Sequence, residues 1–310
     1  MMKKQTRGMI TMLQRNTLFE KKSESNTAHP SPWVKLPDRE ILFKKRAHRF
    51  AHLATTSPNK EDLLFWAHFC NAQQQLTNTL QDFSTALSRF TTVSTPPFDR
   101  SKILSLGFYD SVVHNFLNHI STSALPLKYQ EAFNQIQQKQ DQWRLWGHNL
   151  LNYPLSHQHL AEHIFIIGAL QIIYCLTASQ LDPQTLTPQQ NNLCPACAGT
   201  HLANIVGGWK GEEKQRLCSC LYCGASWRSA HLQCTFCNTT HNTFHHNFEK
   251  DSKNILLDSI LIETCEVCRH DYNQLNQQDH SSLNVFADDN ENAHPRFFLE
   301  ISPSFEAEEL

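Results

Sequence analysis

The stretch of sequence that decides the fold reads Cys194-Pro195-Ala196-Cys197, then Cys220-Leu221-Tyr222-Cys223, then Cys234-Thr235-Phe236-Cys237, and last Cys265-Glu266-Val267-Cys268. Two residues separate the cysteines of each pair. A gap of that size lets a tight turn aim both sulfurs at one ion while backbone N–H groups point at the thiolates. Because two such turns complete a tetrahedral site, the eight cysteines predict two four-thiolate metal sites.

The way in which four pairs share two ions determines the architecture. Sequential grouping assigns the first two pairs to one metal and the last two to the other. It leaves roughly two dozen residues between the halves of each site, which is enough for a β-hairpin. Interleaved grouping stays open. The segments Ser226 to Leu232, Thr243 to Phe248 and Ser259 to Thr264 have the composition of strands. Such small ribbons bury little apolar surface, so we expect the ions to supply most of their folding free energy.

Other uses of the cysteines fit the sequence less well. Disulfide bonds would need an oxidising compartment, and the apolar run from Met9 to Leu13 is too short for a signal-peptide core. We therefore expect a cytoplasmic protein with reduced thiols. A thioredoxin-like site would have one pair at a helix start. Cys218 is an alternative ligand, a redox-reactive thiol or a bystander. The nearby histidines are expected beside the ligands or on the surface, not on a metal: His201, His231, His241, His245 and His246.

Apolar residues recur every three or four positions from Leu36 to about residue 180, which predicts a helical domain. Asp38 is expected to cap the first helix, whose basic side chains should lie on a solvated face. These basic residues are Lys44, Lys45, Arg46 and Arg49. A long amphipathic helix is predicted from about residue 60 to Phe90, with Cys70 as a small core residue. A further helix is predicted from Leu127 to Leu151.

The segment from Leu160 to Leu176 is apolar nearly all round and includes Cys175. A membrane span needs about twenty such residues, and Gln171 interrupts this shorter run. We therefore expect a central buried helix and no membrane association. The formal net charge of -2 also argues against a generic surface for nucleic acids or other polyanions.

The predicted fold class is α+β with several domains, in which an all-helical N-terminal domain precedes two tandem four-cysteine modules. A disordered extension is expected over residues 1–35 and the helical domain over residues 36–180. A linker rich in Pro, Gln and Asn then covers residues 181–192. The two modules should occupy residues 193–232 and 233–285, and an acidic mobile tail residues 286–310.

This order of parts resembles the family of the formate dehydrogenase accessory protein FdhE. The resemblance rests on Cys194 to Cys197, Leu221 to Trp227, Cys234 to Cys237 and Glu263 to Cys268. Three departures stand out: Ala198-Gly199 replaces the family's usual Gly-Ser, Cys218 is extra, and Arg269 replaces the usual Gly after the last pair. The first and third are expected to loosen a turn, but none removes a ligand.

The resemblance implies a cytoplasmic protein whose two modules are rubredoxin-like, or zinc-ribbon-like. It also implies a protein that active respiratory formate dehydrogenase requires and that contacts the catalytic subunit of that enzyme. The family is associated with iron at these cysteines. Tetrahedral thiolate sites accept iron and zinc, and we expect iron in cells with zinc as the alternative. The oligomeric state, including a homodimer, stays open.

No P-loop, nucleophile elbow, HExxH or dinucleotide fingerprint occurs in the sequence, so a maturation factor is predicted instead of an enzyme. Two alternatives share the cysteine sites. One is a rubredoxin-type electron carrier. The other is a zinc-ribbon nucleic-acid-binding protein, which would need a basic face with exposed aromatic residues. The basic residues of the ladder region are offset by acidic ones: Lys210, Arg216 and Arg228 against Glu212, Glu213 and Glu249.

Overall fold

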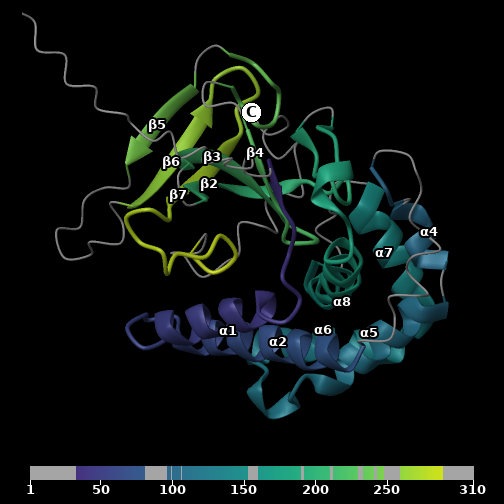
Figure 1. The fold of residues 1–310 in the computed structure, drawn as a ribbon. Helices are drawn as coiled ribbons and strands as arrows, with labels where there is room; N and C mark the ends of the chain where they lie inside the picture. Colours follow the sequence, from purple (N-terminus) through teal and green to yellow (C-terminus); the bar gives the residue numbers. More distant parts are fainter. Residues whose placement is uncertain are drawn as a thin grey trace, which may run out of the picture. The chain divides into compact units, whose positions relative to one another are not determined.

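The computed structural model describes residues 33–80, 96–98, 100–105, 107–152, 160–189, 192–209, 212–229, 233–240, 243–247 and 259–288. Residues 1–32 of the predicted extension and 289–310 of the predicted tail lie outside these ranges. Apart from one short strand at the start, helices precede strands along the chain (Figure 1). This confirms the predicted fold class, a helical N-terminal region followed by a sheet region with two four-cysteine clusters. The residue boundaries of the predicted domains stay a prediction.

The helices of the described residues pack around an aromatic core. The ring centroids of Phe65 and Tyr129 lie 4.5 Å apart in a stack, and Phe69 meets Phe116 edge to face at 5.0 Å. Short 3-10 turns occur at residues Thr122–Ala124, Gln140–Gln142 and Pro183–Thr185. The α-helices are α1 (Leu42–Leu53), α2 (Lys60–Thr79), α4 (Arg100–Ser105), α5 (Gly107–His119), α6 (Leu127–Gln138), α7 (Trp143–Asn152) and α8 (Leu160–Ala178).

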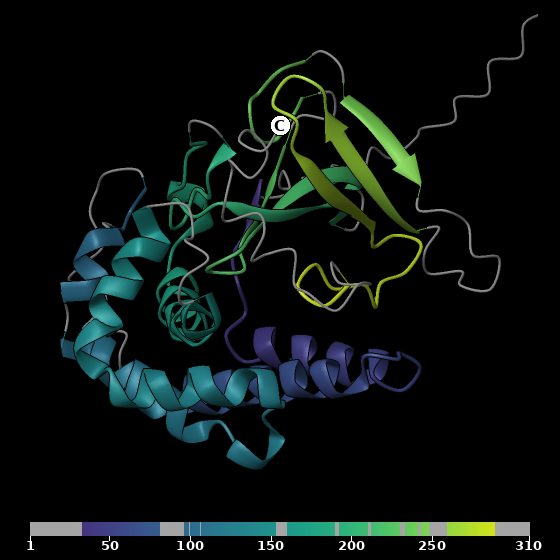
Figure 2. The same ribbon diagram turned by 180° about the vertical axis from the view of Figure 1, so that it is seen from behind.

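Helix α8 is the central helix that the sequence predicted. It packs against α2, α5, α6 and α7, and its described side chains, from Glu162 to Ala178, are all buried. Figure 2 shows α8 between the outer helices and the sheet. The polar Gln171 inside it is satisfied, because its side-chain oxygen accepts from Gln73 Nε2 at 2.9 Å. Among the described residues, none of the helices combines the length and hydropathy that a membrane crossing requires.

The predicted continuous helix over 127–151 is wrong, since the chain breaks at Lys139 and divides into α6 and α7. The indole Nε1 of Trp143 donates to the Ile136 carbonyl oxygen at 2.8 Å. In an unbroken helix that oxygen would accept from the backbone N–H of Gln140. The tryptophan therefore replaces a backbone hydrogen bond and allows the turn. The predicted single helix from residue 60 to Phe90 is also wrong in extent, because α2 ends at Thr79 with Leu80 as its C-cap; residues 81–90 lie outside the described residues.

The solvated face predicted for α1 is wrong for two of its four basic residues, because Arg46 and Arg49 are buried. The guanidinium of Arg49 donates to both carboxylate oxygens of Asp288, 239 residues later, at 2.6 to 3.0 Å. The guanidinium of Arg46 lies 4.2 Å from the ring centroid of Phe286. The first residues of the predicted tail thus cover this helix. The predicted helix cap at Asp38 is wrong: Ile41 is the N-cap of α1 and no side chain caps it, whereas the Asp38 side chain accepts from the backbone N–H of Glu40 at 3.0 Å in the preceding turn.

The strands of the described residues form one seven-stranded sheet with the order β1-β4-β3-β2-β7-β6-β5. Their bounds are β1 (Val34–Lys35), β2 (His201–Trp209), β3 (Glu212–Cys220), β4 (Ser226–Arg228), β5 (Thr243–Asn247), β6 (Ile260–Cys265) and β7 (Asp271–Asn276). Strands β5 and β6 match two predicted segments to within one residue at each end, whereas β4 covers only the first three residues of the segment predicted over 226–232. The pairing of β2 with β7 is parallel, whereas the other pairs are antiparallel. This pairing joins the strands around both cysteine clusters into a single sheet.

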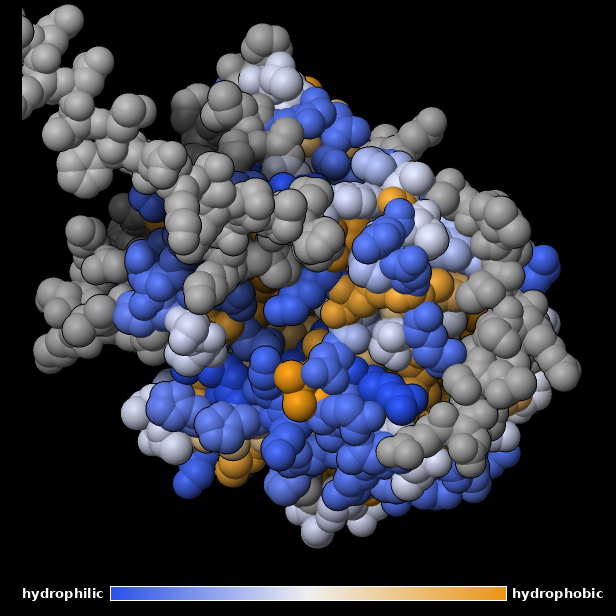
Figure 3. All heavy atoms as spheres, viewed as in Figure 1, coloured by the Kyte–Doolittle hydropathy of each residue, from blue (hydrophilic) through white to orange (hydrophobic). Residues whose placement is uncertain are grey.

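The hydropathy of the surface agrees with this arrangement. On the face seen in Figure 3, hydrophilic side chains dominate over α1 and α2, and hydrophobic ones gather in the middle of the view. Amphipathic helices that bury one side against a core are expected to show such an outer surface.

Candidate metal centres

The eight predicted ligands come together in two groups of four. Cys194, Cys197, Cys220 and Cys223 form one group, called the first centre, and Cys234, Cys237, Cys265 and Cys268 form the other, called the second centre. The sulfurs of each group lie within 4.8 Å of one another. Of the two groupings that the spacing left open, the structure shows the sequential one.

The distances between the sulfurs suit a tetrahedral ion. The Sγ atoms of Cys197 and Cys220 are 3.5 Å apart and those of Cys194 and Cys223 3.6 Å apart. In the second centre two such distances are both 3.7 Å. A metal–sulfur bond of about 2.3 Å implies an edge of about 3.8 Å in a regular tetrahedron. A disulfide would need about 2.05 Å, and the eleven cysteines are free thiols. Both groups therefore fit a four-thiolate metal ion, and this geometry accepts iron and zinc alike.

Each pair of cysteines lies in the same kind of turn. In the first, the backbone N–H of Ala198 donates to the Cys194 carbonyl oxygen at 2.8 Å. The residue after the second cysteine has a left-handed φ in all four turns: 54° at Ala198, 77° at Gly224, 60° at Asn238 and 57° at Arg269. Glycine adopts this conformation freely, whereas a Cβ makes it unfavourable. Two of the departures noted in the sequence, at 198 and 269, thus affect conformationally demanding positions.

The thiols of the first centre differ in how readily they lose a proton, because neighbouring thiols affect one another's pKa. Burial raises the pKa of Cys194 and of Cys223 well above the usual value. Burial acts in the same direction on Cys220, but hydrogen bonds from the other thiols hold its pKa well below that value. Backbone N–H groups also point at the sulfurs, as that of Ala225 does at the Cys223 Sγ, 3.4 Å away. A cation among the four sulfurs would allow all four to be thiolates, because metal-bound thiols are deprotonated.

The thiols of the second centre also differ in pKa, and this centre is more exposed to solvent. Burial raises the pKa of Cys234 and of Cys268. Burial also acts on Cys265, but hydrogen bonds from the backbone of Cys268 and Val267 lower its pKa below the usual value. Cys237 is exposed, unlike any ligand of the first centre.

Side chains from the helices hold the turns of the first centre, and no sequence motif indicates them. Arg100 NH1, at the start of α4, donates to the Ala198 carbonyl oxygen at 2.9 Å. The same guanidinium lies 4.8 Å from the ring centroid of Tyr222, so it links both turns. Gln171 Nε2 of α8 donates to the Leu221 carbonyl oxygen at 3.0 Å. A lone arginine and a buried glutamine form no motif, so their role becomes visible only once the helices are placed.

Cys218 belongs to neither centre. It is buried, and its Sγ lies 3.5 Å from the Asn204 Oδ1. Burial raises the pKa of Cys218 to about 12, which makes it a poor nucleophile and metal ligand. Cys70 and Cys175 are buried core residues, as predicted, and burial raises the pKa of each to about 12.

Of the five histidines predicted to lie beside the ligands or on the surface, His201 lies beside a turn of the second centre. It is buried, and its Nε2 lies 2.9 Å from the Thr235 hydroxyl in a turn of the second centre. Burial, together with the charge of Arg216, lowers the pKa of His201 to about 4, so the ring is neutral at physiological pH. His231 and His241 lie outside the described residues, as do the side chains of two histidines whose backbone lies in β5, His245 and His246.

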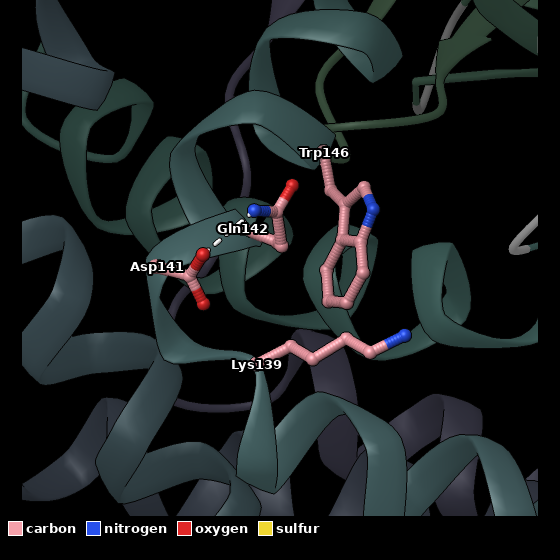
Figure 4. Close-up of a pocket in the computed structure, with 4 residues that line it drawn as sticks. All are labelled: Lys139, Asp141, Gln142 and Trp146. Atoms are coloured by element: carbon pink, nitrogen blue, oxygen red, sulfur yellow. Dashed lines mark hydrogen bonds between the residues drawn. The ribbon is translucent and has the colours of Figure 1, made fainter.

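A pocket lies in the helical region, far from both centres in the sequence. Lys139, Asp141, Gln142 and Trp146 line it (Figure 4). The Gln142 amide donates to the Asp141 carboxylate at 2.7 Å, and the Lys139 side chain extends past the Trp146 ring. These residues provide neither a nucleophile with an adjacent base nor a set of metal ligands. We assign no chemistry to this pocket.

Comparisons with known proteins agree on one family. The family model described as "FdhE, N-terminal" matches residues 31–191, more than half of the chain. A "Protein FdhE homolog" from Rhizobium meliloti (strain 1021) is 28% identical over 264 residues, which cover 84% of this chain and 85% of the homologue. A protein of the same name from Proteus mirabilis (strain HI4320) is 23% identical over 288 residues, 90% of each chain. The crystal structure of the FdhE protein from Pseudomonas aeruginosa shares the fold, with a TM-score of 0.68 at 20% identity over 87% of this chain and 94% of that one. The chain therefore belongs to the FdhE family.

Proposed function

We propose that this protein is an accessory factor in the maturation of respiratory formate dehydrogenase and that it binds the catalytic subunit of that enzyme in the cytoplasm. The observation that carries the proposal is the family match over residues 31–191, in a chain whose following residues form two four-sulfur centres. The resemblance in the cysteine turns supports the same role.

The two centres are proposed to hold one metal ion each, iron in cells with zinc as the alternative. Cys194, Cys197, Cys220 and Cys223 would bind the first ion, and Cys234, Cys237, Cys265 and Cys268 the second. A bound ion would cross-link two turns and, as iron, would also provide a one-electron redox couple. The protein's own contribution is to hold the turns and to exclude water from the first centre.

The protein is proposed to act by binding, without catalytic turnover. The support comes from the described residues, whose buried thiols outside the centres have raised pKa values and are poor nucleophiles. The pocket in Figure 4 offers no catalytic set either. A rigid scaffold that recognises an unfinished subunit needs neither a reactive thiol nor a catalytic pocket.

A complementation assay tests this function. A strain lacking its own FdhE-family protein should regain formate-dependent dye reduction when it expresses this chain. The double variant Cys220→Ala, Cys223→Ala should lose that activity and co-purification with the catalytic subunit, because the first centre loses two ligands. Cys218→Ala is the matched control, since it removes a buried thiol of the same strand that belongs to neither centre, and should behave as wild type. If the double variant folds, co-purifies and complements like wild type, the centres play no part in the function.

An electron carrier of the rubredoxin type is the second candidate, and the exposure of Cys237 favours it, because electrons reach an exposed centre readily. Iron-loaded protein would then show a reversible one-electron change in its absorption spectrum, with reduction by a cellular reductase. If the iron-loaded protein complements but no reductase reduces it, the carrier role is excluded.

A further inference from the structure

The two centres differ in how far solvent reaches them. All four cysteines of the first centre are buried, the most exposed being Cys220 at 1%. In the second centre Cys234 and Cys265 are buried, but Cys268 is partly exposed and Cys237 is exposed. The two sites share one turn geometry and one ligand set, so this difference comes from what surrounds them.

The helices enclose the first centre. Gln171 of α8 and Arg100 of α4 donate to carbonyl oxygens of the two turns. The Tyr222 hydroxyl donates to the Leu150 carbonyl oxygen of α7 at 2.8 Å. A Cβ on Gly224 would lie 2.7 Å from the side chain of Leu42, which shows how closely α1 approaches the turn. Opening this centre to solvent therefore requires breaking contacts with four helices.

Among the described residues, aromatic side chains cover part of the second centre. There, Phe236 stacks on His270 with ring centroids 4.5 Å apart, and His201 lies 4.4 Å away. One of its turns also receives a hydrogen bond from Asn192, the last residue of the predicted linker, whose Nδ2 donates to the Thr235 carbonyl oxygen at 3.2 Å. Val267, between Cys265 and Cys268, is 60% exposed. An incoming ligand can thus approach this centre without moving a helix.

Metal exchange in a four-thiolate site proceeds by ligand substitution. A bond forms between the metal and an incoming soft anion such as a thiolate, and one metal–sulfur bond breaks. The released cysteine sulfur takes a proton from water, and no atom changes its oxidation state. This step needs contact between the metal and solvent. We propose that the second centre exchanges its metal and its ligands with thiolates from solution, that Cys237 is the ligand displaced, and that the first centre is a permanent structural site. The inference rests on the proposed metal binding at both centres.

The test is zinc release from the full-length protein loaded with two equivalents of zinc. Excess chelator should remove zinc in two phases of equal size, one ion in each. The three hydrogen bonds between the helices and the turns of the first centre, each worth roughly a factor of five in an opening equilibrium, predict a slow phase at least about 100-fold slower. Added small thiols should accelerate the fast phase alone. Protein that binds two zinc ions and releases them at one rate would overturn the asymmetry while leaving the metal centres intact. Protein that binds no zinc would overturn the metal centres as well.

Three measurements assign the phases. Cys237→Ala should retain one zinc ion, released in the slow phase only. Arg100→Met should accelerate the slow phase and leave the fast phase unchanged, whereas Arg144→Met, which removes an exposed ion pair with Asp110, should alter neither. Alkylation of zinc-loaded wild type, read by mass spectrometry, should modify Cys237 first, with no need for a variant to fold. Loss of the slow phase in Cys237→Ala, or earlier alkylation of the first centre, would overturn the proposal.

Discussion

A buried ion pair joins the strands of the two cysteine modules and offers the sharpest test of the fold. Arg216 on β3 donates from NH2 to both carboxylate oxygens of Glu263 on β6, at 2.6 and 2.7 Å. The hydroxyl of Tyr272 on β7 donates to the same carboxylate at 2.6 Å. The two charged side chains are only 2% and 1% exposed. These contacts cross the parallel junction between β2 and β7, and they connect residues that a chain of two independent modules would leave apart.

Replacing Glu263 with Gln keeps the shape of the side chain and leaves the guanidinium of Arg216 buried without an anion. Removing one partner of a buried ion pair costs about 3–5 kcal/mol, because the other charge remains desolvated. That is a large part of the roughly 5–15 kcal/mol by which a typical domain is stable. Tyr272→Phe removes two hydrogen bonds, one that the hydroxyl donates to Glu263 and a longer one that it accepts from Arg216 NH2 at 3.1 Å. The ion pair itself remains, so this change should cost less, about 1.5–3 kcal/mol.

The assay is denaturant unfolding of the zinc-loaded protein at fixed zinc concentration, followed by far-ultraviolet circular dichroism. A double-mutant cycle with Arg216→Met and Glu263→Leu isolates the pair, because the double variant buries no charge. We expect the double variant to be more stable than Arg216→Met or Glu263→Leu alone. A free energy of unfolding for Glu263→Gln within about 1 kcal/mol of wild type would refute the reasoning, since an orphaned buried guanidinium cannot cost so little.

Two further predictions concern backbone and packing, each measured by the same unfolding assay. Ala198→Gly and Arg269→Gly should each stabilise the zinc-loaded protein by about 1 kcal/mol, because both residues have a left-handed φ that disfavours a Cβ; lower stability in both would contradict this account of the turns. Gly168→Ala should destabilise it by about 1–3 kcal/mol, because the new Cβ would overlap the ring of Phe69, whereas Gly107→Ala, with nothing within 4 Å, should not. Equal effects at the two glycines would show that core packing is not the cause.

The sequence predicted the features that depend on short-range chemistry. The spacing of the cysteines determined which residues could be ligands, and the apolar run around Gln171 identified the central helix. Both signals are local, since a turn of four residues or one helix face contains the whole pattern. The break at Lys139 was not predicted, because it depends on one tryptophan side chain that donates a hydrogen bond to the Ile136 carbonyl oxygen.

The long-range features escaped prediction for a different reason. Helical periodicity shows that Arg46 and Arg49 share a side of α1, but it does not show what covers that side. The cover comes from Phe286 and Asp288, near the other end of the chain. The parallel pairing of β2 with β7 is likewise a contact between segments about seventy residues apart, such as Asn204 with Gln274. No pattern within either segment specifies its partner.

The residue after the second cysteine of each pair has a left-handed φ in all four turns, but the space available to its side chain differs from turn to turn. All four turns need a left-handed φ there, yet glycine occurs only at position 224. At that turn the side chain of Leu42 fills the space that a Cβ would take. Asn238 and Arg269, in the turns of the open second centre, carry full side chains in the same conformation. Strain alone would favour glycine at every turn, so the restriction of glycine to 224 follows from the approach of Leu42. The other turn of the enclosed first centre carries Ala198, whose side chain is a single methyl group, and Arg100 of α4 contacts this turn. The two turns that pack against helices therefore have the smallest residues at this position, whereas both turns of the open centre have large ones.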